Sequence, residues 1–107
     1  MAEQLLDEAL HTEAHPLIYF RPGRDGRRRP ALLGTRLYVW QVINTVRASN
    51  GSVSEAAEYL DLRPAQVQAC VSYYAEFRDE VDALAKQEQE FARQEQERWE
   101  REQEVLA

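Results

Sequence analysis

Apolar residues recur at helical spacing near the start of the chain. Leu5, Leu6, Ala9 and Leu10 fall on one face of a helix, and Pro16 ends the pattern. We therefore expect a short amphipathic helix within residues 1–16, with a role in packing.

Two short apolar runs, residues 17–20 and 31–33, flank a polar segment at 21–30. Apolar runs on either side of a turn are typical of paired strands, and Asp25-Gly26 is a hairpin-type turn signal. The pattern predicts a small two-stranded ribbon with an arginine-rich connection.

A helical pattern with one buried face follows over residues 37–47. Its apolar positions are Val39, Val42, Ile43 and Val46, and Asn50-Gly51 ends it. A second helix is predicted over residues 52–60. Ser52, three positions before Glu55, is a candidate capping box for that helix. Its inward positions are Ala56, Ala57 and Leu60.

Residues 61–63 form a predicted tight turn, and Pro64 suits the first position of a third helix. A helix-turn-helix needs a small residue where its two helices touch, which Ala57 provides, and apolar residues beside the turn, which Leu60 and Leu62 provide. The turn itself usually holds glycine. Asp61 stands there in this chain, and aspartate tolerates the left-handed region at modest cost.

Periodicity divides the third helix into two faces. The expected inner face is Val67, Cys70, Val71, Tyr74 and Phe77, and the expected outer face is Ala65, Gln66, Gln68, Ala69, Ser72 and Tyr73. Neither glycine nor proline occurs after Pro64. One long helix to the C-terminal end and a helix bent near residues 78–79 therefore both fit the sequence.

Apolar residues thin out in residues 79–107. Glu88 and Glu95 occupy positions where a continuous coiled coil needs apolar residues, so that seam fails. Large apolar residues on a charged helix are typical anchors in a partner's groove, although they could equally rest on a second subunit. The partner-binding candidates are Leu84, Phe91, Trp99 and Leu106.

The expected fold is mainly α, a helix-turn-helix with a three-helix core, a short N-terminal β-ribbon and a long C-terminal helix. We divide it into an N-terminal helix (1–16), a helix-turn-helix domain with an arginine-rich ribbon (17–78), and a charged helical tail (79–107).

Length and composition refine this picture. The chain has 107 residues, and its polar tail leaves a small compact part for which a homodimer is the expected support. The single cysteine cannot form an internal disulfide, and early acidic residues do not resemble a secretory signal, so we expect a cytoplasmic protein. No apolar run approaches the ~20 residues of a membrane span.

The net charge of -6 is unevenly distributed. Residues 21–47 hold seven arginines against one acid, between two acidic segments. Such an arrangement suits two different partners, of which one is anionic.

DNA fits the anionic partner. Close arginines repel one another unless anions are near, and amides or hydroxyls on a third helix can read base edges in a major groove. The candidate DNA-binding residues are Arg24, Arg27, Arg28, Arg29, Arg36, Arg63, Gln66, Gln68 and Ser72. The alternatives are a solvated arginine loop and a helix pair that docks onto protein.

The sequence offers no catalytic constellation, so we expect no enzyme, cofactor or metal. His11 and His15 have the spacing of a zinc pair, but no third ligand stands nearby. Cys70 is interpreted as a small core residue. The glycines near Arg24 lack the lysine and following helix of a phosphate-binding loop.

The Gly34-Thr35-Arg36 triplet entering the first helix of the core, followed by residues 52–60, Val67 and the Tyr73-Tyr74 pair, resembles a family of small bacterial domains described as VapB-like antitoxins. The resemblance covers residues 18–82. It implies a dimeric DNA-binding domain that represses its own promoter and neutralises a toxin with a PIN-like ribonuclease fold. The alternative is a dimeric adaptor that does not bind DNA and recruits a protein through its C-terminal helix.

Overall fold

The computed structural model describes residues 2–23 and 26–107, with side chains from Glu8 onward. An N-terminal helix, α1 (Ala2–Ala14), leads into a two-stranded ribbon of β1 (Ile18–Pro22) and β2 (Arg28–Leu32). Three helices follow, α2 (Val39–Ala48), α3 (Val53–Leu60) and α4 (Pro64–Glu76), and the last helix is α5 (Arg78–Leu106). The expected fold class, mainly α with an N-terminal ribbon and a long C-terminal helix, is confirmed.

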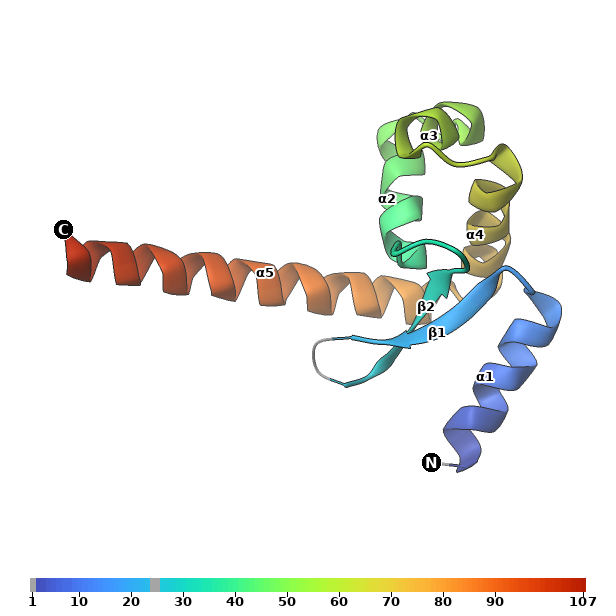
Figure 1. Cartoon of the computed structure of the whole chain (residues 1–107), viewed down its shortest axis with the longest axis horizontal. Helices are drawn as coiled ribbons and strands as arrows, with labels where there is room; N and C mark the ends of the chain where they lie inside the picture. Colours follow the sequence, from blue (N-terminus) through green and yellow to red (C-terminus); the bar gives the residue numbers. More distant parts are fainter. Residues whose placement is uncertain (1, 24–25) are drawn as a thin grey trace.

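The elements are arranged as a body with a projecting arm (Figure 1). The helices α2, α3 and α4 lie on one side of the ribbon, α1 lies on the other, and α5 leaves the body as a rod. The strands are antiparallel, with Ile18 opposite Leu32 and Pro22 opposite Arg28. An additional bridge between Ala31 and Tyr38 ties the ribbon to the start of α2.

The core lies where the ribbon, α2, α3, α4 and the first turns of α5 meet. Its buried residues come from all of these elements: Ile18, Leu32, Val39, Val42, Ile43, Ala56, Ala57, Val67, Cys70, Tyr73 and Val81. Burial of this apolar surface is the main stabilising contribution to such a small body. Because Val81 belongs to this cluster, the first turns of α5 are part of the body and only the remainder is the arm.

The helix boundaries follow from local chemistry. The Ser52 hydroxyl accepts from the Glu55 amide at 3.1 Å, as a capping residue should, whereas the Ser52 amide donates to the Ser49 carbonyl rather than to the Glu55 side chain. Asp61 adopts the left-handed conformation, with φ 56° and ψ 46°. The Leu62 amide then donates to the Ala57 carbonyl at 2.8 Å, which closes the end of α3. The turn geometry expected at Asp61 is therefore confirmed.

The third helix of the core does not run on into the tail. Phe77 has φ -121° and ψ 39°, which is not helical, and it separates α4 from α5. The sequence allowed both one long helix and a bend near residues 78–79. The structure has the break at Phe77, without the help of glycine or proline.

The packing of α4 differs from the expected division into two faces. Tyr73, expected on the outer face of α4, is fully buried, whereas Val71, Tyr74 and Phe77 are only partly buried. The change has a cause outside α4, because the ring of His11 in α1 lies against Tyr73 and Phe77. In α1 itself Leu10 is exposed, so this histidine contributes to the packing in place of that leucine.

The left-handed turn generates the first prediction. Replacing Asp61 by valine should lower the free energy of unfolding by about 1–2 kcal/mol, because a β-branched side chain is strained at positive φ. Asp61→Gly should change it by less than about 1 kcal/mol or raise it. Urea denaturation of both variants measures the difference, and equal effects would contradict the role given to this turn.

Candidate nucleic-acid interface and partner arm

The outer face of α4 is the candidate surface for reading DNA. Val67, Cys70 and Tyr73 point into the core, which leaves Ala65, Gln68 and Ser72 exposed. Of the residues expected to contact bases, Gln68 and Ser72 therefore lie on an accessible helix face. Their amide and hydroxyl groups can both donate and accept hydrogen bonds.

The side chain of Gln66 forms a hydrogen bond within the start of α4. Its side-chain oxygen accepts from the Arg63 amide at 2.8 Å, which caps the first turn of α4. A bidentate base contact by Gln66 would have to share the oxygen that accepts this bond. The structure thus gives Gln66 a role in helix capping, and its expected role as a base reader stays a prediction. The side chain of Arg63 is exposed at the start of α4.

The ribbon arginines have counterions within the chain. The Arg28 Nε donates to both oxygens of Glu8 in α1, at 2.7 and 2.8 Å, and its Nη2 donates to the Phe20 carbonyl at 3.2 Å. Arg29 is 3% exposed, and its Nη1 lies 2.5 Å from Oε1 of Glu88 in α5. The expected phosphate contact by Arg29 is wrong, because this side chain is buried against a carboxylate. For Arg28, a phosphate would have to bind beside Glu8 or displace it.

The other expected DNA-binding arginines are placed differently. Arg27 and Arg36 have exposed side chains, and Arg24 lies outside the described residues. The Arg36 carbonyl accepts from Arg21 Nη2 at 2.7 Å, and the guanidinium of Arg21 stacks over the ring of Tyr38 at 4.2 Å. This stacking fixes the segment that enters α2, next to the Gly34-Thr35-Arg36 triplet.

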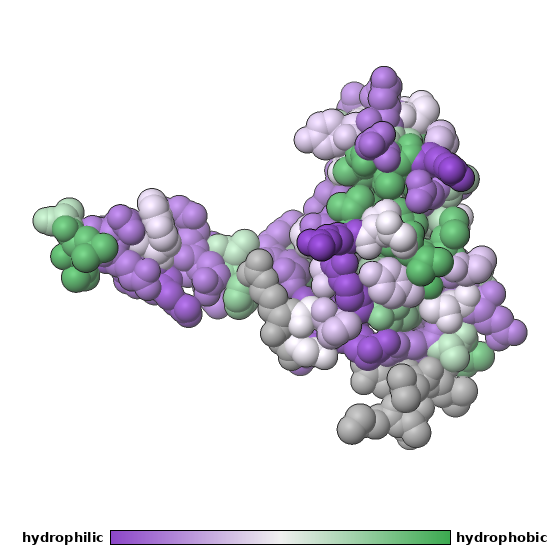
Figure 2. Space-filling model, in the orientation of Figure 1, coloured by the Kyte–Doolittle hydropathy of each residue, from purple (hydrophilic) through white to green (hydrophobic). Residues whose placement is uncertain are grey.

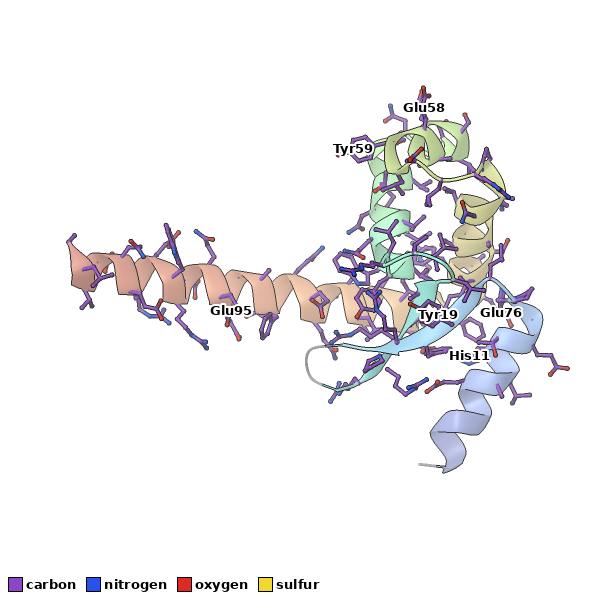
Figure 3. The ribbon with its side chains drawn as sticks, viewed as in Figure 1. His11, Tyr19, Glu58, Tyr59, Glu76 and Glu95 are labelled. Carbon is purple, nitrogen blue, oxygen red and sulfur yellow. The ribbon has the colours of Figure 1, made fainter. Side chains whose placement is uncertain are left out.

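An aromatic cluster attaches α1 to the end of α4. His11 Nδ1 lies 3.2 Å from the Tyr73 hydroxyl, and its ring centroid lies 4.0 Å from that of Phe77. His15 Nε2 lies 2.6 Å from Glu76 Oε2. Figure 3 labels His11 and Glu76 in this region, where α1 meets the end of α4. The two histidines thus bind different partners, and among the residues that the structure describes no group of three His, Cys, Asp or Glu is placed to hold a metal.

The partner-binding candidates lie along α5. Leu84 is partly buried beside the body, whereas Phe91, Trp99 and Leu106 have exposed fractions of 38%, 56% and 79%. Figure 2 shows apolar surface at the tip of the rod, where Val105 and Leu106 end α5. Within the described part of the chain, no helix is both long and apolar enough to cross a membrane.

Burial changes the acidity of two side chains in α4. It raises the pKa of the Cys70 thiol to about 12 from an ordinary value of 9.0, so the thiol stays protonated and unreactive at neutral pH. Burial also raises the pKa of Tyr73, and the nearby carboxylates of Glu80, Glu76 and Glu8 add to that shift. Both groups act as neutral core residues.

Sequence reasoning missed the carboxylates that hold the ribbon. Glu8 and Glu88 stand in helices far from the arginines along the chain, and no local spacing links them. The uneven charge was visible: basic residues 21–47 lie between two acidic segments. The structure pairs one arginine with each of those segments, whereas the charge pattern by itself indicates an external anion.

Comparisons of the chain with known protein families, with curated proteins and with solved structures find no match.

The ion pair of Arg29 generates a stability prediction. Arg29→Ala should lower the free energy of unfolding by about 2–4 kcal/mol, because removing one partner leaves the Glu88 charge uncompensated in a mostly buried position. Arg27→Ala, an exposed neighbour in the same ribbon, should change it by about 0.5 kcal/mol or less. Urea denaturation of both variants is the measurement. Similar losses for the two would show that the pair contributes little.

A pH prediction follows from Tyr73. The unfolded chain releases the tyrosine proton at lower pH than the folded chain, so the free energy of unfolding should fall as pH rises above about 10. Tyr73→Phe should flatten that fall, since it removes one shifted group. Urea denaturation of the unaltered chain and of Tyr73→Phe at several alkaline pH values is the measurement, and identical profiles would contradict the assignment.

Proposed function

We propose that the chain is a DNA-binding antitoxin. As a homodimer it binds operator DNA through α3, the turn at Asp61 and α4, and it neutralises a PIN-like ribonuclease through α5. The observation that carries the proposal is the division of α4 into a core face and an exposed face bearing Gln68 and Ser72. A helix presented in this way after a tight turn is the arrangement by which helix-turn-helix proteins enter the major groove.

Phosphate contacts are assigned to the exposed arginines Arg27, Arg36 and Arg63. These side chains lie in the ribbon, before α2 and before α4, so they come from three separate segments. Contacts with the DNA backbone from several segments fix a protein's orientation on the duplex and leave sequence reading to the helix. The family resemblance of residues 18–82 supports the same function.

The second candidate is a dimeric adaptor that does not bind DNA. It is favoured by Arg28 and Arg29, whose charges are met by Glu8 and Glu88 within the chain. This pairing removes two of the arginines whose crowding suggested an external anion. In this reading the helix-turn-helix is a platform, and α5 alone recruits the partner.

DNA binding is tested with the duplex upstream of the protein's own gene. Gln68→Ala should weaken binding to the cognate sequence by ~1 to 3 kcal/mol and leave random DNA almost unaffected, because an amide can make a bidentate contact with a base edge. Gln89→Ala, the same substitution at an exposed position of α5, is the matched control. Fluorescence anisotropy of labelled duplexes gives the affinities.

The same measurements at several salt concentrations test the arginines. Arg27→Ala, Arg36→Ala and Arg63→Ala should each reduce the slope of log affinity against log salt by ~0.9. Equal losses for Gln68→Ala on both DNAs would assign Gln68 to the backbone. If selection from a random DNA library returns no preferred sequence, the adaptor replaces the DNA-binding antitoxin.

A further inference from the structure

One face of α5 carries a regular alternation. Successive steps of three or four residues keep positions on one side of a helix. Along α5 such steps give Leu84, Glu88, Phe91, Glu95, Trp99, Glu102 and Leu106, which we call the α5 stripe. Large apolar residues and glutamates alternate at every position of the stripe. The glutamates that interrupt a coiled-coil seam are therefore themselves periodic.

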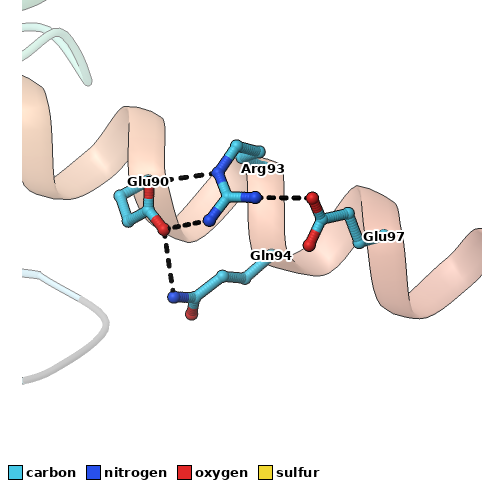
Figure 4. Close-up of polar contacts among 4 residues, drawn as sticks. All are labelled: Glu90, Arg93, Gln94 and Glu97. Atoms are coloured by element: carbon cyan, nitrogen blue, oxygen red, sulfur yellow. Dashed lines mark hydrogen bonds and ion pairs between the residues drawn. The ribbon is translucent and has the colours of Figure 1, made fainter.

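The opposite face of α5 satisfies its own charges. Arg93 pairs with Glu90 and with Glu97, and Gln94 donates to Glu90 at 3.3 Å (Figure 4). These contacts lower the pKa of Glu90, chiefly through the hydrogen bond from Arg93. Pairs of this kind at steps of three and four support an isolated helix. This face has the character of a solvated surface, which makes it a control for the stripe.

At the end of the stripe next to the body, one glutamate already binds an arginine. Glu88 lies 2.5 Å from Arg29, with side-chain exposures of 18% and 4% for the glutamate and the arginine. Leu84 is partly buried beside it. One glutamate of the stripe thus meets a basic group of the ribbon, and the apolar residue one turn before it is partly buried. The pair of Glu88 with Arg29 thus shows that a glutamate of the stripe can be partly buried against an arginine.

Further along, the same pattern is exposed. Ala92, Glu95, Gln96 and Trp99 line a shallow, open depression on the rod. Figure 3 shows Glu95 on this outer part of α5, away from the body. Its carboxylate lies 3.2 Å from Arg98 and keeps 45% of its side-chain surface exposed. Trp99 is 56% exposed, which is a large apolar area for a charged helix.

A second copy of α5 is a poor occupant. In an antiparallel pair that matches Phe91 with Trp99, Glu95 faces its own copy and Glu88 faces Glu102. In a parallel pair in register, each glutamate again faces a glutamate. Like charges placed directly opposite one another are destabilising, so charge complementarity favours a basic partner.

We propose that the α5 stripe binds a groove of another protein in which apolar pockets alternate with arginine or lysine side chains about 10 Å apart, the rise of seven helical residues. Trp99 fills a pocket, while Glu95 and Glu102 meet the basic side chains. The inference rests on the partner-binding half of the proposed function and supplies its chemistry.

The test uses the full chain and synthetic helical peptides as probes. One peptide carries leucine and arginine alternating along one face at steps of three and four residues, and its isomer carries the same arginines on the opposite face. Fluorescence anisotropy of labelled peptides should show binding of the first and at least tenfold weaker binding of the second. Binding of the first should also weaken as salt rises.

Matched variants locate the contact on α5. Glu95→Gln with Glu102→Gln should weaken binding of the alternating peptide about tenfold, and Trp99→Ala should weaken it by at least as much. Glu90→Gln with Glu97→Gln removes the same number of charges from the opposite face and should change the affinity less than about twofold. Equal losses in the two double variants, or equal binding of the two peptides, would overturn the proposal.

Two further outcomes are distinguishable. Sedimentation of the full chain tests for self-association. If the chain self-associates and Trp99→Ala abolishes this, the stripe is assigned to a second copy instead. DNA binding is measured separately on the upstream duplex. Peptide binding without DNA binding would reject the DNA-binding antitoxin and retain the stripe, whereas DNA binding without peptide binding would reject the stripe alone.

Discussion

The buried ion pair between Arg29 and Glu88 joins the ribbon to α5 beyond the hydrophobic core that both already share. A guanidinium that is almost fully enclosed needs a carboxylate, because burying an unpaired charge costs several kcal/mol. Glu88 can pair with Arg29 only if α5 passes the ribbon with its residue 88 next to that arginine. The direction in which the arm leaves the body is therefore coupled to the burial of one ribbon side chain.

The second attachment works in the same way through the neighbouring arginine of β2. Glu8 holds Arg28, His15 holds Glu76, and His11 covers the hydroxyl of Tyr73. These contacts place α1 across the ribbon and the end of α4. Together the two helices supply carboxylates to the ribbon, so that Arg28 is held by Glu8 and Arg29 by Glu88. Among the described arginines of the ribbon and its turn, Arg27 is exposed.

Local patterns predicted much of this structure. Apolar spacing, the Ser52 cap, the turn at Asp61 and the proline at the start of α4 act within a few residues, so the helix-turn-helix could be located from sequence. Tyr73 and Tyr74 could not be assigned by periodicity alone, since both lie near the edge of the apolar face and α1 decides which one is covered. The burial of Arg29 depends on a helix from the other end of the chain. For the candidate site, exposure of Gln68 and Ser72 followed from the pattern, whereas the capping role of Gln66 depends on the rotamer that brings its oxygen to the Arg63 amide.

Because α5 starts anew after the break at Phe77, the number of residues beyond it sets both the length of the arm and the direction in which each side chain points. Beyond this residue α5 is continuous to Leu106, so each position has a defined azimuth around the rod. Inserting one residue beyond Glu88 would rotate the outer part of the stripe by about 100° relative to the body, while inserting seven would advance it by about 10 Å and nearly restore its facing. Insertions in this arm therefore keep the stripe facing the same way only when they add residues in steps of about seven. Such an insertion would present the same contact residues to a partner at a different distance from the body.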